Sequence, residues 1–398
     1  MPGTTLVLAV PNSSEGDSLR EAAAEYGASH EVTIDIVQAP YSNLFEKIAN
    51  SCRAGTGAYD LVLVDDPWFT FLMENGCFRE LTPMFGTQGA AGPDVDFLSS
   101  SLDLCRHPFG EGPAFCLPYV GNAQLFFYNA RMFADHGLPE APTSWAEALP
   151  VMREITDTGD GQVFGYVLRG QEGNPVVANF LPIFWSFGGR MFDAQGRPQV
   201  DSPEGLAALE FFLELKEISP PGSESFNADE LGTYLLQGAA AAAINWPNWV
   251  TAFEDPEQSR VVGRMSYSRI PDGTRPGSSE IGHWLLAITD HSASPEEAFE
   301  FLSWATSREQ MTLSAERGNS PVRESVFTDP ALTSQERFRH FPVLMEAIQS
   351  STPRPRHARW PEIENAFGVE LSKAVAGRLG PREALVKANE EIRRIVER

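Results

Sequence analysis

The sequence lacks several features that would define common classes of protein. No apolar run approaches the length of a membrane span. Basic residues are scarce: 30 Lys and Arg stand against 54 Asp and Glu, which gives a formal net charge of −24. Such an excess of negative charge repels nucleic acid and anionic membrane surfaces, so we expect neither as a partner.

Metal-binding and redox motifs are also missing. The chain has four cysteines and no C-x-x-C, which argues against a zinc ribbon or a thioredoxin-type site. We therefore expect neither a metal nor a cofactor. The even count permits disulfides in an oxidising compartment. Cys105 and Cys116 flank a turn rich in Gly and Pro and form our preferred pair; the alternative is that Cys52, Cys77 and these two are all free thiols.

Motifs of catalysis are equally scarce. No G-x-G-x-x-G, Walker loop or H-E-x-x-H occurs. Residues 16–19 read Gly-Asp-Ser-Leu, as in the GDSL hydrolases, but the first strand ends near Val10, and none of the seven histidines follows an Asp by three residues. We therefore interpret Asp17 or Ser18 as the cap of a helix. The sequence predicts a protein that is not an enzyme.

What the chain does contain is a pattern of alternating strands and helices. Its 398 residues favour two domains. Three strands, at residues 5–10, 31–37 and 59–64, are separated by predicted helices, which indicates a parallel sheet. Ligands of such sheets bind beyond the carboxyl ends of the strands. Those ends read PNSS (11–14), QAPY (38–41) and DDPW (65–68).

Later segments carry clear signals of helix starts. Ser144 and Glu147 have the spacing of a capping box. Ser202 and Ser294 each precede a proline that suits the first helical position. Residues 107–129 are rich in Gly and Pro before a strand-like end, and we interpret them as the crossing between two lobes.

The segment GAAAAAINWPNWV (238–250) stands out because alanine is the best helix former. We predict that Gly238 ends a helix and that the alanines form a short buried strand against their propensity. The strand would deliver Asn245 and Trp246 to a binding surface, and Pro247 would stop it there. For Trp249 we favour a packing role.

Aromatic residues recur beside amides and prolines at predicted loops. An aromatic ring covers the C–H face of a sugar, while Asp, Asn and Arg hydrogen-bond to its hydroxyls. Any single tryptophan could instead belong to the core. The residues of this set are Tyr41, Trp68, Tyr119, Trp185, Trp246, Trp249 and Trp284.

The order of these segments resembles that of the extracellular solute-binding proteins of carbohydrate ABC transporters, the family that includes maltose-binding protein. The matching stretches are spread over nearly the full length. They are YDLVLVDDPWFTFLMENGCFRELTPMF, LPYVGNAQLFFYNARMFADHGLPEAPTSWAEAL, YLLQGAAAAAINWPNW, IGHWLLAI, SPEEAFEFLSWATSREQ and the C-terminal RPRHARWPEIENAF…PREALVKANEEIRRIV.

The resemblance implies an α/β fold of type II with two lobes, each a mostly parallel sheet flanked by helices. Lobe I would hold residues 1–117 and 262–320, lobe II residues 118–261 and 321–398, with hinge strands near 113–121, 258–268 and 316–323. A sugar or polyol would bind in the cleft between the lobes, and hinge closure would precede docking on a membrane permease. We expect a monomer in the periplasm or outside the cell, and the N-terminus shows no signal peptide.

The expected ligand-binding residues follow from the strand ends and from the resemblance. They are Asn12, Ser13, Tyr41, Asp66 and Trp68 in the first lobe, Asn122 and Gln124 near the hinge, Trp185, Asn245 and Trp246 in the second lobe, and His283, Trp284 and Arg356 elsewhere.

Three of these assignments keep an alternative. Asp66 is either an acceptor for sugar hydroxyls or a helix N-cap before Pro67. Arg356 either reaches the cleft or is a solvated arginine, which we favour. We interpret His283 as a polar wall of the cleft and not as a metal ligand.

For the ligand we expect a neutral mono- or oligosaccharide or a polyol. An anionic sugar derivative becomes plausible only if Arg356 and His283 both face the cleft. The alternative function is a carbohydrate-active enzyme, a glycosidase or lyase, which needs two facing carboxylates. A protein that presents its ligand to a sensor instead of a permease is a further alternative.

Overall fold

The computed structural model describes residues 4–87 and 92–398, and its contacts divide the chain into two compact units. The first unit contains residues up to Asn122, Gly282–Gln349 and Arg356–Ala358. The second unit contains Ala123–Ile281, Ser350–Pro355 and Arg359–Arg398.

This division differs from the expected lobe boundaries at two places. Residues 262–281 belong to the second unit because Met265–Ser268 pair with a strand of that unit. Residues 321–349 belong to the first unit, where the Leu98 N–H donates to the Val322 carbonyl (3.0 Å). The chain crosses between the units after Asn122, directly beyond the hinge predicted near 113–121, and again after Ile281, Gln349, Pro355 and Ala358.

The first unit is built on a mixed sheet of five strands in the order β2-β1-β3-β8-β4. β1 pairs in parallel with β2 and β3, as the alternating pattern predicts, whereas β8 runs antiparallel to β3 and β4. β3 and β8 are buried along their whole length, which explains their continuous apolar sequences. β2 lies at the edge and alternates between partly buried and exposed residues.

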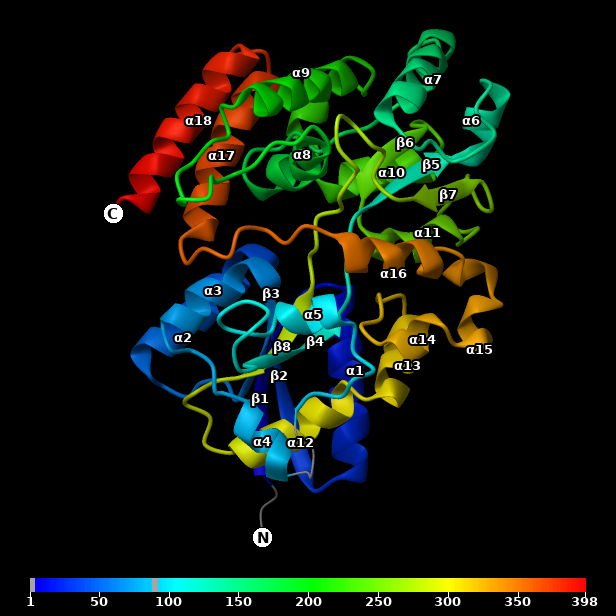
Figure 1. Ribbon diagram of the computed structural model, residues 1–398. Coiled ribbons are helices and arrows are strands. Elements are labelled where there is room, and N and C mark those ends of the chain that lie inside the picture. Colours follow the sequence, from blue (N-terminus) through cyan, green and yellow to red (C-terminus); the bar gives the residue numbers. More distant parts are fainter. Residues whose placement is uncertain (1–3, 88–91) are drawn as a thin grey trace. The chain divides into compact units, whose positions relative to one another are not determined.

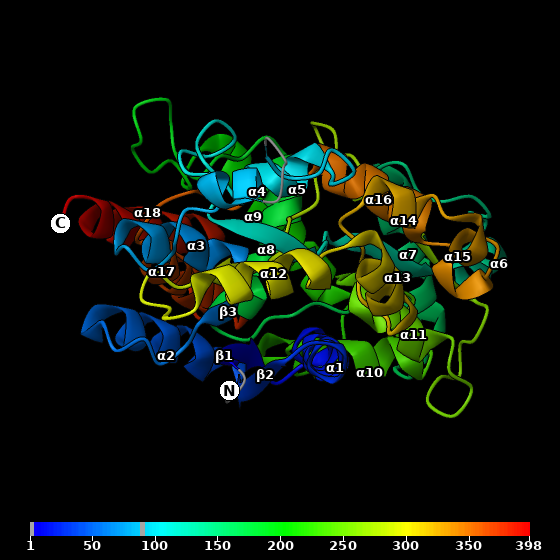
Figure 2. The ribbon, with the colours of Figure 1, turned by 90° about the horizontal axis from the view of Figure 1, so that it is seen from below.

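Helices pack against this sheet. Among them, α1 contacts β1 and β2, and α12 and α13 both contact α1 (Figures 1 and 2). The elements are β1 Thr4–Pro11, α1 Ser14–Ser29, β2 Val32–Ala39, α2 Tyr41–Ala54, β3 Leu61–Asp65, α3 Asp66–Glu74, α4 Thr82–Thr87, α5 Ser99–Asp103, β4 Cys116–Val120, β8 Trp284–Ile288, α12 Pro295–Ala305, α13 Arg308–Glu316, α14 Glu324–Phe327, α15 Pro330–Thr333, η3 Glu336–Phe338 and α16 Phe341–Ser350.

The second unit has a three-stranded sheet in the order β6-β5-β7, and both pairings are antiparallel. The expectation of a mostly parallel sheet is therefore wrong for the named strands of this unit. Parallel pairing in this unit is confined to isolated bridges, namely Ser144 with Asp272, Phe164 with Ala240 and Glu280 with Thr352. The helices α6 to α10 that lie between β5 and β6 in the chain do not form a βαβ crossover, because such a crossover joins parallel strands and these two strands are antiparallel.

The alanine-rich segment forms a strand, as predicted. Helix α10 ends at Leu236, and Gly238 follows in the left-handed region at φ +68°. β6 then runs from Ala242 to Asn245 with every residue buried. Pairing with β5 and close packing outweigh the helix propensity of alanine here.

Four helices of this unit, α8, α9, α17 and α18, pack together in Figure 1 around a core of aromatic and aliphatic residues. The elements are β5 Leu125–Asn129, α6 Ala130–Asp135, α7 Trp145–Thr158, α8 Asn174–Ser186, α9 Pro203–Glu217, η1 Ser223–Ser225, α10 Ala228–Leu236, β6 Ala242–Asn245, η2 Pro247–Trp249, α11 Val250–Phe253, β7 Met265–Ser268, α17 Trp360–Val375 and α18 Pro381–Val396.

Three of the predicted helix starts are confirmed. Ser144, Ser202 and Ser294 are N-cap residues, although the Ser294 side chain makes no capping hydrogen bond. The first helix departs from the prediction: its N-cap is Ser13, so Asp17 and Ser18 lie inside α1. The sequence signal failed because the helix begins directly after β1.

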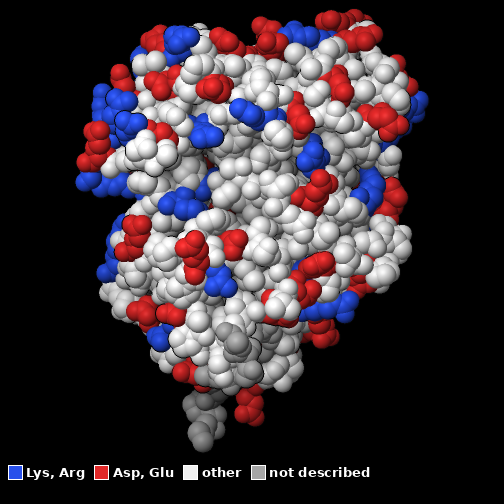
Figure 3. Space-filling model, viewed as in Figure 1, with Lys and Arg blue, Asp and Glu red and all other residues white. Residues whose placement is uncertain are grey.

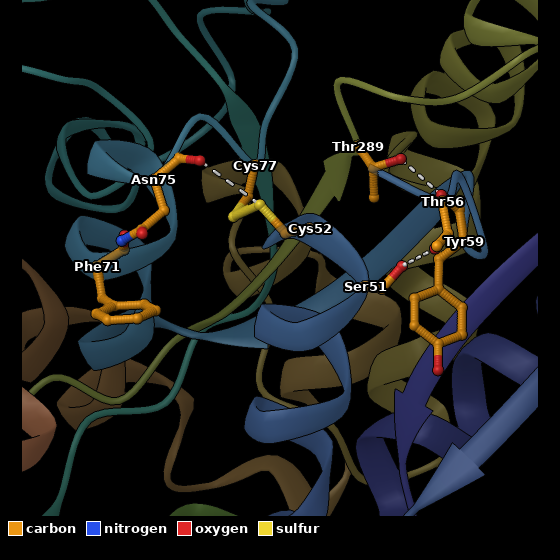
Figure 4. The surroundings of a disulfide bond; sticks show 8 residues. All are labelled: Ser51, Cys52, Thr56, Tyr59, Phe71, Asn75, Cys77 and Thr289. Atoms are coloured by element: carbon orange, nitrogen blue, oxygen red, sulfur yellow. Dashed lines mark hydrogen bonds between the residues drawn. A yellow bond between two sulfur atoms is a disulfide. The ribbon is translucent and has the colours of Figure 1, made fainter. Parts of the chain in front are cut away.

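The predicted cysteine pair is wrong. The disulfide joins Cys52 of α2 to Cys77 after α3, with a Cα–Cα distance of 5.3 Å (Figure 4). Cys105 and Cys116 are free and buried. Their side chains are nevertheless close enough to hydrogen-bond to each other, and burial together with this contact raises the pKa of the Cys116 thiol.

The surface carries both signs of charge. Figure 3 shows Asp and Glu interspersed with Lys and Arg on the viewed face. None of the helices within residues 4–87 and 92–398 combines the length and apolar character needed to cross a membrane.

The disulfide generates a first prediction. The bond closes a loop with a sequence separation of 25. Replacing both cysteines (Cys52→Ser, Cys77→Ser) should lower the free energy of unfolding by about 3 kcal/mol, because the unfolded chain regains loop entropy. Urea unfolding followed by circular dichroism measures the loss.

Dithiothreitol provides the control. It should destabilise the wild-type protein by a similar amount and leave the double variant unchanged. Four reactive thiols in denatured protein that has not been reduced would contradict the assignment of this disulfide.

Candidate functional site

One edge of the first unit's sheet gathers eight of the residues that the sequence predicted for ligand binding. The carboxyl ends of β1, β2, β3 and β4 meet there, and antiparallel β8 begins there, opposite Asp65. Residues at this edge come from segments far apart in the chain. They are Asn12, Ser13, Tyr41, Asp66, Trp68, Asn122, His283 and Trp284.

Three aromatic rings form a cluster at this edge. Tyr41 lies 4.8 Å from Trp68 and 6.1 Å from Trp284, between ring centroids, and the two tryptophans are 5.9 Å apart. Both tryptophans are buried, whereas Tyr41 is 39% exposed. The Tyr41 hydroxyl donates to Asp65 Oδ2 at 2.8 Å. Tyr41 is thus the member of the cluster that offers a ring face.

Asp66 and Arg356 lie together inside the first unit. The N-cap of α3 is Asp65, so Asp66 is not the cap. The Asp66 side chain is fully buried, and its Oδ2 lies 3.5 Å from Arg356 Nη1. Arg356 also donates to the carbonyls of Asp66 (3.3 Å) and Leu104 (2.8 Å).

Arg356 is therefore not the solvated arginine that we favoured from the sequence. Its side chain is 15% exposed, and its guanidinium lies 5.1 Å from the ring centroid of Phe69 and 5.5 Å from that of Phe109. The aromatic rings and the Asp66 carboxylate account for this burial of a cation.

His283 and Asn122 are tied into the first unit. His283 is fully buried, with Nδ1 at 3.1 Å from the Asn122 carbonyl and Nε2 at 2.7 Å from Ser101 Oγ. The Asn122 side chain accepts a hydrogen bond from Ser320 at 3.0 Å. Because both histidine nitrogens are occupied, His283 supports the fold and does not form an exposed polar wall.

Asn12 and Ser13 follow β1. The Asn12 backbone N–H donates to the Ala39 carbonyl, which joins the ends of β1 and β2, and the residue is exposed. The Ser13 hydroxyl donates to Glu15 at 2.6 Å. The Asn12 side chain is the more accessible of the two.

In the second unit, Gln124 and Asn245 lie at one end of the strand pair β5–β6. Leu125, which follows Gln124, is in register with Asn245. Both amides are buried, at 0% and 1% exposure. Asn245 Oδ1 accepts from the Trp246 N–H at 2.9 Å. The Asn245 amide nitrogen and both polar atoms of Gln124 have no hydrogen-bond partner among the described residues.

The tryptophans of this unit differ in environment. Trp246 is half-buried directly after β6. Trp249 packs on Gly232, where an added Cβ would come within 2.3 Å of the indole ring, so the predicted packing role is confirmed. Trp185 of α8 is partly buried and packs against the unit's core.

Sequence reasoning missed one candidate, Trp360 at the start of α17. Its side chain is fully buried, and its indole N–H has no partner among the described residues. The sequence offered the same signal that selected the other aromatic residues, because Trp360 lies directly before a proline, Pro361. No group of three or more His, Cys, Asp or Glu in the described ranges could hold a metal ion.

These two α/β units, with polar and aromatic residues at the strand ends, define a two-lobed binding protein of type II. The model of the family of bacterial extracellular solute-binding proteins matches residues 11–312. The chain belongs to this family. It is a solute-binding protein and not an enzyme, so the carbohydrate-active enzyme is no longer a candidate.

Known proteins of this kind resemble the chain over nearly its full length. A solute-binding protein of an ABC transporter from Agrobacterium radiobacter, solved in complex with ribitol, is 28% identical with a TM-score of 0.90, and 99% of each chain is covered. The mannitol-binding protein of Pseudomonas aeruginosa is 24% identical over 99% of this chain and 93% of its own. A probable amino-acid ABC transporter periplasmic-binding protein of Sinorhizobium fredii is 25% identical over 94% and 88%.

The Arg356 environment generates a prediction about stability. Arg356→Met should lower the free energy of unfolding by about 3 kcal/mol, because the buried Asp66 carboxylate loses its counter-charge. Arg356→Lys should lie between this variant and the wild type, since it keeps the charge but not the planar fork. Urea unfolding measures both.

Arg382→Met, at an exposed position of α18, is the matched control and should change stability little. Equal stability of Arg356→Met and this control would show that Arg356 is not an anchor of the first unit.

Proposed function

We propose that this chain binds a small carbohydrate, a mono- or oligosaccharide or a polyol, and delivers it to the permease of an ABC importer. The proposal assigns ligand contacts to Asn12, Tyr41, Trp68, Trp284 and Asp66 in the first unit and to Gln124, Asn245 and Trp246 in the second. Trp185 and Trp360 are further candidates, whereas Asn122, Ser13, His283 and Arg356 support their neighbours.

The proposal rests on two side-chain amides of the second unit, those of Gln124 and Asn245. Both are buried near Trp246, and each has polar atoms without a hydrogen-bond partner among the described residues. Leaving a buried polar group without a partner costs about 1–3 kcal/mol, so such groups call for an explanation. Ligand hydroxyls would satisfy them. An aromatic ring beside amides is also the arrangement that sugars require, because their faces are apolar and their edges polar.

The relatives support the same class of ligand. One was solved with ribitol and another is named for mannitol, and both are polyols. Membership of the extracellular family supports a location in the periplasm or outside the cell, as does the disulfide, which forms in oxidising compartments. Transport by an ABC importer further requires a permease that recognises the ligand-bound protein, and we expect the protein to act as a monomer.

A thermal-shift titration with sugars and polyols tests this function. A ligand present at one hundred times its Kd should stabilise the protein by about 2.7 kcal/mol. Trp246→Ala should abolish the shift for the same ligand at the same concentration while the free protein melts as before, because Trp246 is only half-buried.

Trp249→Ala is the matched control. This tryptophan fills the space above Gly232, so its loss should lower the melting temperature of the free protein and leave the ligand-induced shift in place. The function would be wrong if no member of a broad panel of sugars, polyols and sugar acids produced a shift.

A further inference from the structure

The end of β6 is held by a strand on one side and by side chains on the other. β5 pairs with β6 as far as Asn245, which lies opposite Leu125. On the other side of β6, the Val167 N–H donates to the Ala242 carbonyl at 3.0 Å. Two residues further along β6, the backbone groups of Ile244 are bound by side chains instead.

The side chains that bind Ile244 come from two separate segments of the second unit. The Ile244 N–H donates to the Tyr166 hydroxyl at 3.2 Å, and the Ile244 carbonyl accepts from Asn179 Nδ2 at 3.1 Å. Tyr166 precedes α8, and Asn179 belongs to α8. All three residues are fully buried, so these side chains satisfy backbone groups that would otherwise lack partners.

The Asn179 amide takes the place of a peptide group between two chain segments. Its Oδ1 accepts from the Arg169 N–H at 3.1 Å, while its Nδ2 donates to the Ile244 carbonyl. A side-chain amide carries an acceptor and a donor, as a backbone peptide does, so it can continue a ladder of hydrogen bonds. Both polar atoms of Asn179 therefore have protein partners, in contrast to the amide nitrogen of Asn245.

Ile244 directly precedes Asn245, to which the proposed function assigns a ligand contact. The Trp246 N–H donates to Asn245 Oδ1 at 2.9 Å, so the NH₂ group of Asn245 is the part that can donate to a ligand. A binding group must be held within about 0.5 Å of its working position. The position of this NH₂ group depends on the backbone of Ile244, which Tyr166 and Asn179 fix.

We infer that Asn179 and Tyr166 are positioning residues, which set the affinity for the ligand by holding Asn245 in place and do not contact the ligand themselves. The inference rests on the proposed function and adds two residues to it. In a purely structural role, the same hydrogen bonds would stabilise the fold and leave the affinity of the folded protein unchanged.

Two variants test the inference by isothermal titration calorimetry with ribitol, mannitol and each sugar that raises the melting temperature of the wild-type protein. Tyr166→Phe removes the acceptor for the Ile244 N–H and keeps the ring, and Asn179→Leu removes the amide at similar volume. Each should raise the Kd by about 10-fold or more, because a displacement of about 1 Å can remove most of a group's contribution.

Both variants should also melt at a lower temperature, since each leaves buried backbone groups unpaired. If Asn179→Leu does not fold, Tyr166→Phe alone decides, because it leaves only one backbone group without a partner. An unchanged Kd in the folded variants would overturn the inference and leave the proposed function intact. Failure of the wild-type protein to bind any member of the panel would overturn both.

Asn389→Leu is the matched control. Asn389 is a buried amide of α18, and its Oδ1 accepts from the Val200 N–H at 3.1 Å. Its replacement should lower the melting temperature for the same reason as Asn179→Leu and leave the Kd unchanged. An equal rise of the Kd in this control would show that affinity follows the general stability of the second unit.

The NH₂ signal of Asn245 in ¹⁵N NMR spectra of the free protein shows whether the two residues act through Asn245. The signal should shift in Tyr166→Phe and in Asn179→Leu, because the end of β6 moves, and it should stay in place in Asn389→Leu. A weaker affinity in the first two variants with an unmoved Asn245 signal would contradict positioning through this residue.

Discussion

Buried polar groups require hydrogen-bond partners, and in this respect the polar residues at the sheet edge of the first unit differ from two amides of the second unit. In the first unit, His283, Arg356 and Asp66 meet that requirement through one another or through nearby backbone and hydroxyl groups. In the second unit, the Gln124 amide and the Asn245 amide nitrogen are buried without a hydrogen-bond partner among the described residues. A folded chain tolerates such a cost where a function compensates for it. The proposed ligand supplies the missing partners and gives these two amides their role.

Much of the fold could be predicted because it rests on local patterns. The period-2 alternation and the intervening helices identified β1, β2 and β3, and Gly238 marked the turn that releases the alanines into β6. The antiparallel pairing of β5 with β6 and β7 depends on contacts between residues more than a hundred positions apart, which no local pattern encodes. The Cys52–Cys77 bond escaped prediction for a similar reason, since tertiary packing brings α2 beside the end of α3.

In the predicted site, too, local patterns could be recognised in the sequence, whereas contacts between distant residues could not. Strand ends led to Tyr41, Asp66 and Trp68, since parallel strands deliver their carboxyl ends to one edge. The sequence could not tell that Arg356 binds near Asp66, because 290 positions separate them. Nor could the sequence distinguish Gln124 from Asn122. The Gln124 amide has no hydrogen-bond partner among the described residues, whereas the Asn122 amide oxygen accepts a hydrogen bond from Ser320. Residue type identifies a candidate, and the hydrogen-bond partners decide its role.

The central claim is that Gln124 and Asn245 bind ligand hydroxyl groups. Side-chain amide signals in ¹⁵N NMR spectra report on these groups directly during a titration with ribitol or mannitol. The account predicts that the NH₂ signals of both residues shift with the ligand and that their exchange with water slows. Unchanged NH₂ signals at saturating ligand, with shifts confined to other residues, would contradict it.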